Sequence, residues 1–446
     1  MAGEGETGAR AVSVEETDAG RAAGAGDASA EGAGATPGAD ARASLLTRYR
    51  RLPGNVLAIG LVSLLNDASS EIVYPFLPLF LAALGATPFS IGVIEGAAET
   101  TSGLLKLFAG YWSDRRGRRK GLVVFGYALA SVMRPLLAFA QTWPHVLFIR
   151  LADRVGKGIR SAPRDAMIAD AAAPEERGLA FGFHRAMDHA GAVVGPLIGA
   201  VIIAFVAQRS DAPTAREYAT VFLVASVPAL FAVLVAAFFV RERRRDARVE
   251  MKAPPRLSLR GFDGNFKRFL VVLALFTLSN STDAFLIQRA TEAGVSAVAI
   301  PLLWAALHAL KVLSSLVGGD LSDRLGRKQL IVSGWLLYAA VYAGFAYVSE
   351  AWQAWALFLV YGVYFGLTEG AEKAFVADLV GAERRGTAYG LYNLAFTVTV
   401  LPASLLLGAL WNWWGARAAF LTGGAVGALA ALLLAVAVRT PARREA

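Results

Sequence analysis

The chain has 446 residues, 56% of them hydrophobic, and a formal net charge of +9 at pH 7. It contains no cysteine, so disulfides and thiolate metal sites are excluded, and its four histidines lie on three or more segments, so no metal or other cofactor is expected. Apolar runs of about 20 residues, the length that crosses a bilayer, recur along most of the chain. The basic charge lies in alternate loops beside these runs, so it indicates membrane orientation and not a nucleic-acid partner.

The apolar runs are flanked and divided by polar segments. Counting the runs between polar breaks predicts twelve helices in an all-α membrane protein. Because the basic loops all fall on one side, both termini are expected in the cytoplasm of a multi-pass protein of the cell (plasma or inner) membrane. The predicted parts are a disordered cytoplasmic tail, an N-terminal six-helix bundle, a basic cytoplasmic linker, a C-terminal six-helix bundle and a cytoplasmic tail, at residues 1–47, 48–240, 241–265, 266–438 and 439–446.

The first two predicted spans carry acids where the bilayer core should be. In the first, from about Gly54 to Leu84, the run Asn66–Glu71 (NDASSE) interrupts the apolar pattern. Burying such charge costs several kcal/mol, so these side chains are expected to face a wet cavity or cationic partners. A carboxylate in such a site can take up and release a proton. The proton-coupling residues predicted on this basis are Asp67, Glu71, Glu95 and Glu99.

A loop motif follows the second span and recurs in the second half. Gly110–Lys120 reads GYWSDRRGRRK and Gly319–Lys328 reads GDLSDRLGRK, with matching positions 209 residues apart, as in Gly110 and Gly319. The repeat indicates a duplicated protein. Its predicted role is a conformational latch between bundles, formed by Gly110, Asp114, Arg115, Gly117, Arg118, Gly319, Asp323, Arg324, Gly326 and Arg327. The alternative is that the arginines only mark the cytoplasmic side.

This motif resembles the signature loop between helices 2 and 3 of the major facilitator superfamily, and the resemblance covers nearly the whole chain. It implies two pseudo-symmetric six-helix bundles with helices 1, 4, 7 and 10 around a central cavity. It also implies alternating access, in which one bundle rocks against the other around a fixed site.

The predicted helix 4 is unusually basic. Arg150, Arg154, Lys157 and Arg164 follow steps of 4, 3 and 7 and therefore share one face, which no bilayer-facing helix could carry. Helix 3 has one further cation, Arg134, for which snorkelling to the membrane surface is the alternative to a buried role. The resemblance makes helix 4 part of the cavity wall. The predicted substrate-binding residues of the first half are Asn66, Arg150, Lys157, Arg160 and Arg164.

Helix 5 contains small residues at regular spacing before and after a proline. The pattern resembles the superfamily's antiporter motif in that helix, although Ala200 replaces its final glycine. Small residues four apart also permit close helix packing, so a packing role alone is the alternative. The motif residues are Gly191, Gly195, Pro196 and Gly199.

The second half repeats the polar theme. The predicted substrate-binding residues there are Asn280 and Asp283 in helix 7 and Glu369 and Lys373 in helix 10. Helix 10 corresponds to helix 4 at a separation of 208 residues, with Glu372 at the position of Arg164 and Lys373 at that of Asp165. This inversion of charge suggests ion pairs between the two bundles.

These features predict a secondary active transporter of a small solute, with proton-coupled efflux (antiport) as the leading function. Proton-coupled uptake of an organic anion is an alternative, favoured by the basic stripe of helix 4. A non-transporting membrane receptor or scaffold is a third possibility. No His-Glu-x-x-His or Gly-x-Ser-x-Gly pattern occurs, so an enzyme is not expected. The expected partners are the lipid bilayer, protons and the substrate, with the protein acting as a monomer.

Overall fold

The structure is a computed structural model that describes residues 51–116, 118–173, 176–207, 213–242, 257–381 and 384–440. The predicted N-terminal tail, Gly117, most of the predicted linker and the last six residues lie outside these ranges. Every regular element among the described residues is a helix. These residues lie in one compact unit, Tyr49–Ala446.

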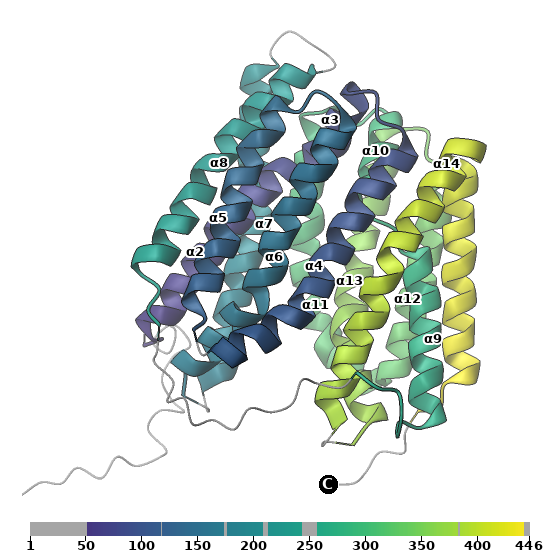
Figure 1. The fold of residues 1–446 in the computed structure, drawn as a ribbon. Coiled ribbons are helices and arrows are strands. Elements are labelled where there is room, and N and C mark those ends of the chain that lie inside the picture. Colours follow the sequence, from purple (N-terminus) through teal and green to yellow (C-terminus); the bar gives the residue numbers. More distant parts are fainter. Residues whose placement is uncertain are drawn as a thin grey trace, which may run out of the picture. The chain divides into compact units, whose positions relative to one another are not determined.

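Six membrane-length rods make up the first half (Figure 1). Gly54–Ala83 forms one rod broken by a short 3₁₀ turn, η2, at Tyr74–Phe76, where Pro75 removes a backbone donor. The polar run Asn66–Glu71 is helical, and the break comes one turn after it. The rods are α2–α3 (Gly54–Val73 and Leu77–Ala83), α4 (Pro88–Arg116), α5 (Lys120–Leu136), α6 (Trp143–Ala171), α7 (Arg177–Val206) and α8 (Ala215–Phe238).

The second half repeats this series. Asn280 ends α9 and Asp283 precedes α10, so the first rod is again broken in its C-terminal part. The long helix α14 has a kink at Gly415, whose φ of 82° favours glycine, and divides there into two rods. The elements are α9 (Gly264–Ser279), α10 (Ala284–Glu292), α11 (Ala299–Leu325), α12 (Arg327–Phe345), α13 (Ala351–Leu379) and α14 (Arg385–Ala437).

Corresponding helices have corresponding neighbours in the two halves. In the first, α6 packs against α4 and α5, and α2 against α7 and α8; in the second, α13 packs against α11 and α12, and α9 against α14. The two halves are joined by extensive contacts of α4 with α14 and of α7 with α11. The duplication relates these two contacts to each other. The fold is therefore a pseudo-symmetric pair of six-helix bundles, as the sequence predicts.

Seven described segments are long and apolar enough to cross a membrane: Gly54–Ala83, Lys120–Phe139, Arg177–Val206, Ala215–Phe238, Gly264–Glu292, Ala351–Leu379 and Arg385–Ala437. The last has 53 residues and contains the Gly415 kink. Among the rods outside this set, α4 and α6 contain the acidic and basic stripes found in the sequence. The chain is a multi-pass membrane protein in which the less apolar rods α4 and α6 hold several internal charges.

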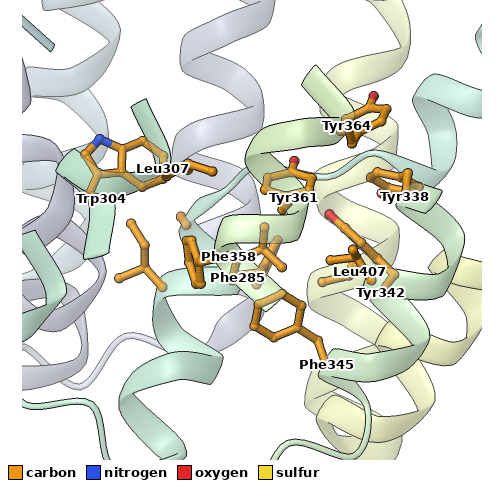
Figure 2. Packing of buried hydrophobic residues seen from close by; sticks show 14 of the residues in the cluster. Phe285, Trp304, Leu307, Tyr338, Tyr342, Phe345, Phe358, Tyr361, Tyr364 and Leu407 are labelled. Carbon is orange, nitrogen blue, oxygen red and sulfur yellow. The ribbon is translucent and has the colours of Figure 1, made fainter. Parts of the chain in front are cut away.

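Aromatic side chains fill much of the core of the second half, as Figure 2 shows for the tyrosines of α12 and α13. The rings of Tyr338 and Tyr342 lie 4.3 Å apart, and those of Tyr361 and Tyr364 5.6 Å apart. The first half has charged side chains in its interior instead. The two halves share a fold but differ in the chemistry of their cores.

Candidate functional site

The most deeply buried ion pair joins α4 to α6. Arg150 donates from Nε and Nη2 to the two carboxylate oxygens of Glu95, both at 2.9 Å, and the side chains are 7% and 1% exposed. This two-pronged geometry satisfies both oxygens at once. Glu95, a predicted proton-coupling acid, and Arg150, a predicted substrate-binding cation, thus bind each other. Neither side chain is therefore available to a solute in this conformation.

A second buried network surrounds Arg134 of α5. This guanidinium donates to the side chain of Asn66 at 2.9 Å and to its carbonyl at 3.1 Å, and it lies 3.6 Å from Asp153. Arg134 is 4% exposed, so the alternative that it snorkels to the membrane surface is wrong. Asn66 also donates to Asp67 at 2.9 Å. The network therefore holds the polar run of α2 against α5 and α6.

The charges one turn further along α4 and α6 reach solvent. Arg154 lies 3.2 Å from Glu99 and Lys157 lies 4.0 Å from it, and about two fifths of the Glu99 and Lys157 side chains are exposed, 41% and 42%. All three lie near the middle of membrane-length helices, far from either end. The two cations favour the charged form of this carboxylate, and an anionic solute that binds them in its place would promote its protonation.

The other predicted cations of α6 have separate partners. Arg160 is 5% exposed, donates to the carbonyl of Gly126 at 3.3 Å and lies over the Tyr127 ring at 4.4 Å. Arg164 binds its sequence neighbour Asp165 at 2.9 Å. The stripe predicted on one face therefore divides into buried members and one accessible member, Lys157.

In the second half the break between α9 and α10 carries a charged group. Asp283 accepts a hydrogen bond from the Tyr361 hydroxyl at 2.7 Å and lies 3.9 Å from Lys311 of α11. The Lys311 ammonium also lies over the Phe365 ring, 3.6 Å from its centre. Asn280, the other predicted residue here, caps the end of α9.

The remaining predicted pair of the second half is exposed. Glu369 and Lys373 of α13 lie 2.9 Å apart, with side chains 55% and 47% exposed. Glu369 interacts electrostatically with Arg185 of α7, so these charges face the first half. The predicted ion pairs between Arg164 or Asp165 and helix 10 are wrong, because each of these groups binds within its own half.

The two halves meet closely at the end of the molecule formed by α3 and α10 (Figure 1). Trp304 of α11 donates from Nε1 to the Glu71 carboxylate at 2.8 Å, and its ring lies 5.0 Å from that of Tyr74. The α10 helix also contacts α3 and α4 there. Toward the other end, α6 and α13 make no comparable contact between described residues. Between described residues, the two halves are thus joined at the α3 and α10 end but not through α6 and α13.

Comparisons with known proteins agree with this architecture. The family model described as Major Facilitator Superfamily matches residues 59–403. An uncharacterised MFS-type transporter of Methanocaldococcus jannaschii is 34% identical over 391 residues, covering 86% of this chain and 95% of that protein. This chain belongs to the Major Facilitator Superfamily.

Two further similarities extend the comparison. The multidrug resistance protein MdtG of Citrobacter koseri is 26% identical over 400 residues, covering 83% of this chain and 92% of that protein. A solved structure of a variant of the nucleoside transporter NupG superposes with a TM-score of 0.73 at 12% identity, covering 86% of this chain and all of that one. The structural likeness shows the superfamily fold, and the chain is a transporter of this class.

The structure describes only part of the superfamily's loop motif. Gly326 has a φ of 92° where α11 gives way to α12, and the next residue, Arg327, binds Asp378 at the end of α13. The first half has the equivalent contact between Arg119 and Asp170. Arg118 is exposed, and Gly110 lies in contact with Ala162 of α6. Gly117 and the side chains of Asp114, Arg115 and Asp323 lie outside what the structure describes.

The superfamily's helix 5 motif lies on the α2 backbone. A Cβ atom added to Gly191 would come within 2.6 Å of the Leu64 carbonyl oxygen, and one added to Gly195 within 2.4 Å of that of Ala68. Gly199 similarly faces Phe76, at 3.0 Å. Glycine is required at these positions because α2 and α7 touch through their backbones. This geometry accounts for the packing role of the motif.

Several residues of the site were not among the predicted site residues, and these include Trp304, Lys311 and Arg185. Lys311 is the most detectable, because a lysine within an apolar helix is costly unless it is paired. Trp304 carries no such signal, since a tryptophan in an apolar run is ordinary, and only the structure shows its contact with Glu71.

Proposed function

We propose that the protein exports a small solute in exchange for protons, by alternating access between two half-transporters. The observation that carries the proposal is the exposed pair Glu99 and Lys157, with the buried Arg154 beside Glu99, near the middle of α4 and α6. Accessible charge at that depth is costly unless a solute or an ion uses it. Glu99 is the acid best placed for proton exchange, and Lys157 the cation best placed to bind an anionic or zwitterionic solute.

The direction of transport is proposed from two lines of support. A relative that covers most of the chain is named a multidrug resistance protein, which favours efflux. The basic loops at the open end favour a cytoplasmic location for that end in the cell membrane, with both chain termini on the same side. With that end in the cytoplasm, the exposed side chains of Glu99 and Lys157 would be available to a cytoplasmic solute, as export requires.

Uptake of an organic anion is the second candidate, and one observation favours it. The side chains of Arg185 and Lys157 are 62% and 42% exposed, so the accessible surface of the first half presents two cations to an anionic solute. The same surface serves either direction, because alternating access is reversible and the gradients decide the net flux.

The experiment has two stages. First, the purified protein is screened for thermal stabilisation by a panel of drugs and metabolites, since a ligand that binds the folded state raises its unfolding temperature. Second, the stabilising compounds are tested in proteoliposomes with an imposed pH gradient of either sign.

Proton-coupled antiport predicts solute movement against the proton gradient in wild type and none driven by that gradient in Glu99→Gln. Movement in the direction of the proton gradient would favour uptake. Binding without flux for every stabilising compound would favour a receptor.

A further inference from the structure

Glu372 is a buried acid that the proposed mechanism does not use. It lies in α13, is 8% exposed, and each of its oxygens accepts one hydrogen bond of 2.8 Å. Trp335 Nε1 of α12 donates to Oε1, and the Tyr392 hydroxyl of α14 donates to Oε2. Within the described ranges, no lysine, arginine or histidine nitrogen lies within 4.0 Å of this carboxylate.

The surroundings of Glu372 are aromatic. Trp335 is fully buried and stacks on Phe276 of α9, with the ring centres 4.0 Å apart and the planes within 3° of parallel. Besides Trp335 and Tyr392, the charged or titratable groups that act on Glu372 are Tyr364, Glu369 and Lys373 of its own helix. Glu369 and Lys373 bind each other and face solvent. A charged carboxylate here would have only neutral hydrogen-bond partners, which favours its protonated form.

The duplication shows that this arrangement is specific to the second half. The residues 208 positions before Trp335, Glu372 and Tyr392 are Tyr127, Arg164 and His184. There the central group is a cation, and Arg164 has a carboxylate partner in Asp165 at 2.9 Å. Glu372 is therefore not a remnant of a symmetric ion pair, because its own half provides it with no counterion.

The two donors to Glu372 differ in what they can do when a proton arrives. An indole N–H only donates, whereas a tyrosine hydroxyl both donates and accepts. With a proton on Oε2, the carboxyl donates to the Tyr392 oxygen, and Trp335 still donates to Oε1. Both protonation states thus keep two hydrogen bonds on the carboxyl group, but the protonated state turns the Tyr392 hydroxyl from donor to acceptor and releases its O–H from Glu372.

We propose that Glu372 is a proton-binding site of the second half and that its protonation state controls the contact between α13 and α14. Tyr389, one turn before Tyr392, donates to the Lys373 carbonyl at 3.0 Å, so two tyrosines of α14 hold α13 at this level. Loss of the proton places a charge among aromatic rings, and α13 must move or admit water to solvate it. The role of this proton site in the transport cycle rests on the proposed function, whereas detection of the proton on Glu372 does not.

The test is infrared difference spectroscopy of the purified full-length protein between acidic and alkaline pH, which detects the C=O vibration of protonated carboxyl groups. Wild type is expected to show such a band, and Glu372→Gln to lose one component of it. The matched control is Glu369→Gln, three residues away, which removes an exposed, ion-paired carboxylate and should keep that component. A Glu372→Gln spectrum identical to that of wild type would overturn the inference, whatever the transport assay gives.

A second pair of variants keeps the test valid if Glu372→Gln does not fold. Tyr392→Phe removes a donor to the carboxylate, and hydrogen bonds stabilise the charged form more than the neutral one. The pH at which the band appears should therefore rise by about one unit, the equivalent of one such bond. Tyr389→Phe, which loses only a bond to a backbone carbonyl, should leave it unchanged. Equal midpoints in the two variants would contradict the assignment.

The infrared test of Glu372 and the transport test of proton coupling can fail independently of each other. A wild-type protein that carries its solute independently of any pH gradient, yet loses the infrared component in Glu372→Gln, refutes proton coupling and supports the proton site. The reverse result refutes the site and supports coupling through another acid.

Discussion

Glu71 of α2 accepts a 2.8 Å hydrogen bond from the indole N–H of Trp304 in α11, so a carboxylate of one half is bound by a donor of the other. The bond lies where α3 and α10 also meet, at the closed end of the molecule. Because one partner belongs to each bundle, the bond must break when that end opens. Glu71, predicted from the sequence as a proton-coupling residue, is thus placed where its protonation would weaken the closed contact.

Trp304→Phe should make the closed end open more often. It keeps an aromatic ring against Tyr74 but removes the hydrogen bond, and bonds to a charged group contribute about 1.5–3 kcal/mol. A cysteine introduced at Thr282, beside Tyr74, is the reporter, and it is unique because the chain has no other. Its labelling by a membrane-impermeant thiol reagent, added on the side of α3 and α10, should be roughly tenfold faster in the variant.

The control for this experiment is Trp352→Phe, which loses an indole bond to Glu350 at an exposed helix start and should not change the labelling rate. Equal labelling of the Trp304→Phe protein and its parent would show that the Glu71 bond does not hold this end closed.

Breaking the pair between Glu95 and Arg150 should destabilise the protein. Removal of either partner leaves a buried charge without compensation, which costs about 3–5 kcal/mol. Glu95→Gln and Arg150→Met are each expected to lower the unfolding temperature in detergent. The double variant should recover much of the loss, because it removes both charges together. Additive losses in the double variant would contradict a direct pairing.

Lys157→Met should weaken the binding of anionic substrates and have little effect on neutral ones. Its ammonium is an accessible cation near the middle of the membrane span. We expect KM for anionic compounds found by the stabilisation screen to rise about tenfold, the effect of losing one charge-assisted bond. Lys267→Met, at an exposed end of α9, is the control. A similar rise in KM in both variants would indicate a general effect of net charge.

Gly195→Ala should destabilise the packing of α7 on α2. The added Cβ would lie 2.4 Å from the Ala68 carbonyl oxygen, closer than any real contact, so the helices must separate. We expect a lower unfolding temperature and reduced transport. Gly182→Ala, on the same helix with nothing within 4 Å, should cause no loss, since alanine favours helix over glycine. If the two variants had equal stability, close approach at Gly195 would be unnecessary.

The fold was predictable because its signals are local and repeated. Span length, loop charge and each copy of the motif, at Gly110 and at Gly319, can be recognised within about 20 residues of sequence. The break in the first rod follows from Pro75, whereas the polar run Asn66–Glu71 stays helical because its groups are satisfied by neighbours such as Arg134. Periodicity identified the face of α6 that carries charge, but not which members would be buried.

The pairings within the site needed the structure. Glu95 and Arg150 belong to helices that the sequence cannot place side by side at a given height, and a charge inversion at Glu372 suggested a partner in the wrong half. Glu372 instead binds two neutral donors, one of them Trp335, and neither donor has a distinctive sequence pattern. The type of residue in the interior was predictable, whereas its partner depended on tertiary contacts.

The proposed transport requires two halves that open alternately at opposite ends of the molecule. The direct measurement is the distance between paired spin labels on introduced cysteines, one pair at Ala83 and Thr291 at the closed end, the other at Ala173 and Gly381 after α6 and α13. Changing pH or adding a stabilising compound should lengthen the first distance and shorten the second. If both distances stay constant under every condition in a protein that still transports its solute, alternating access by rocking of these halves is contradicted.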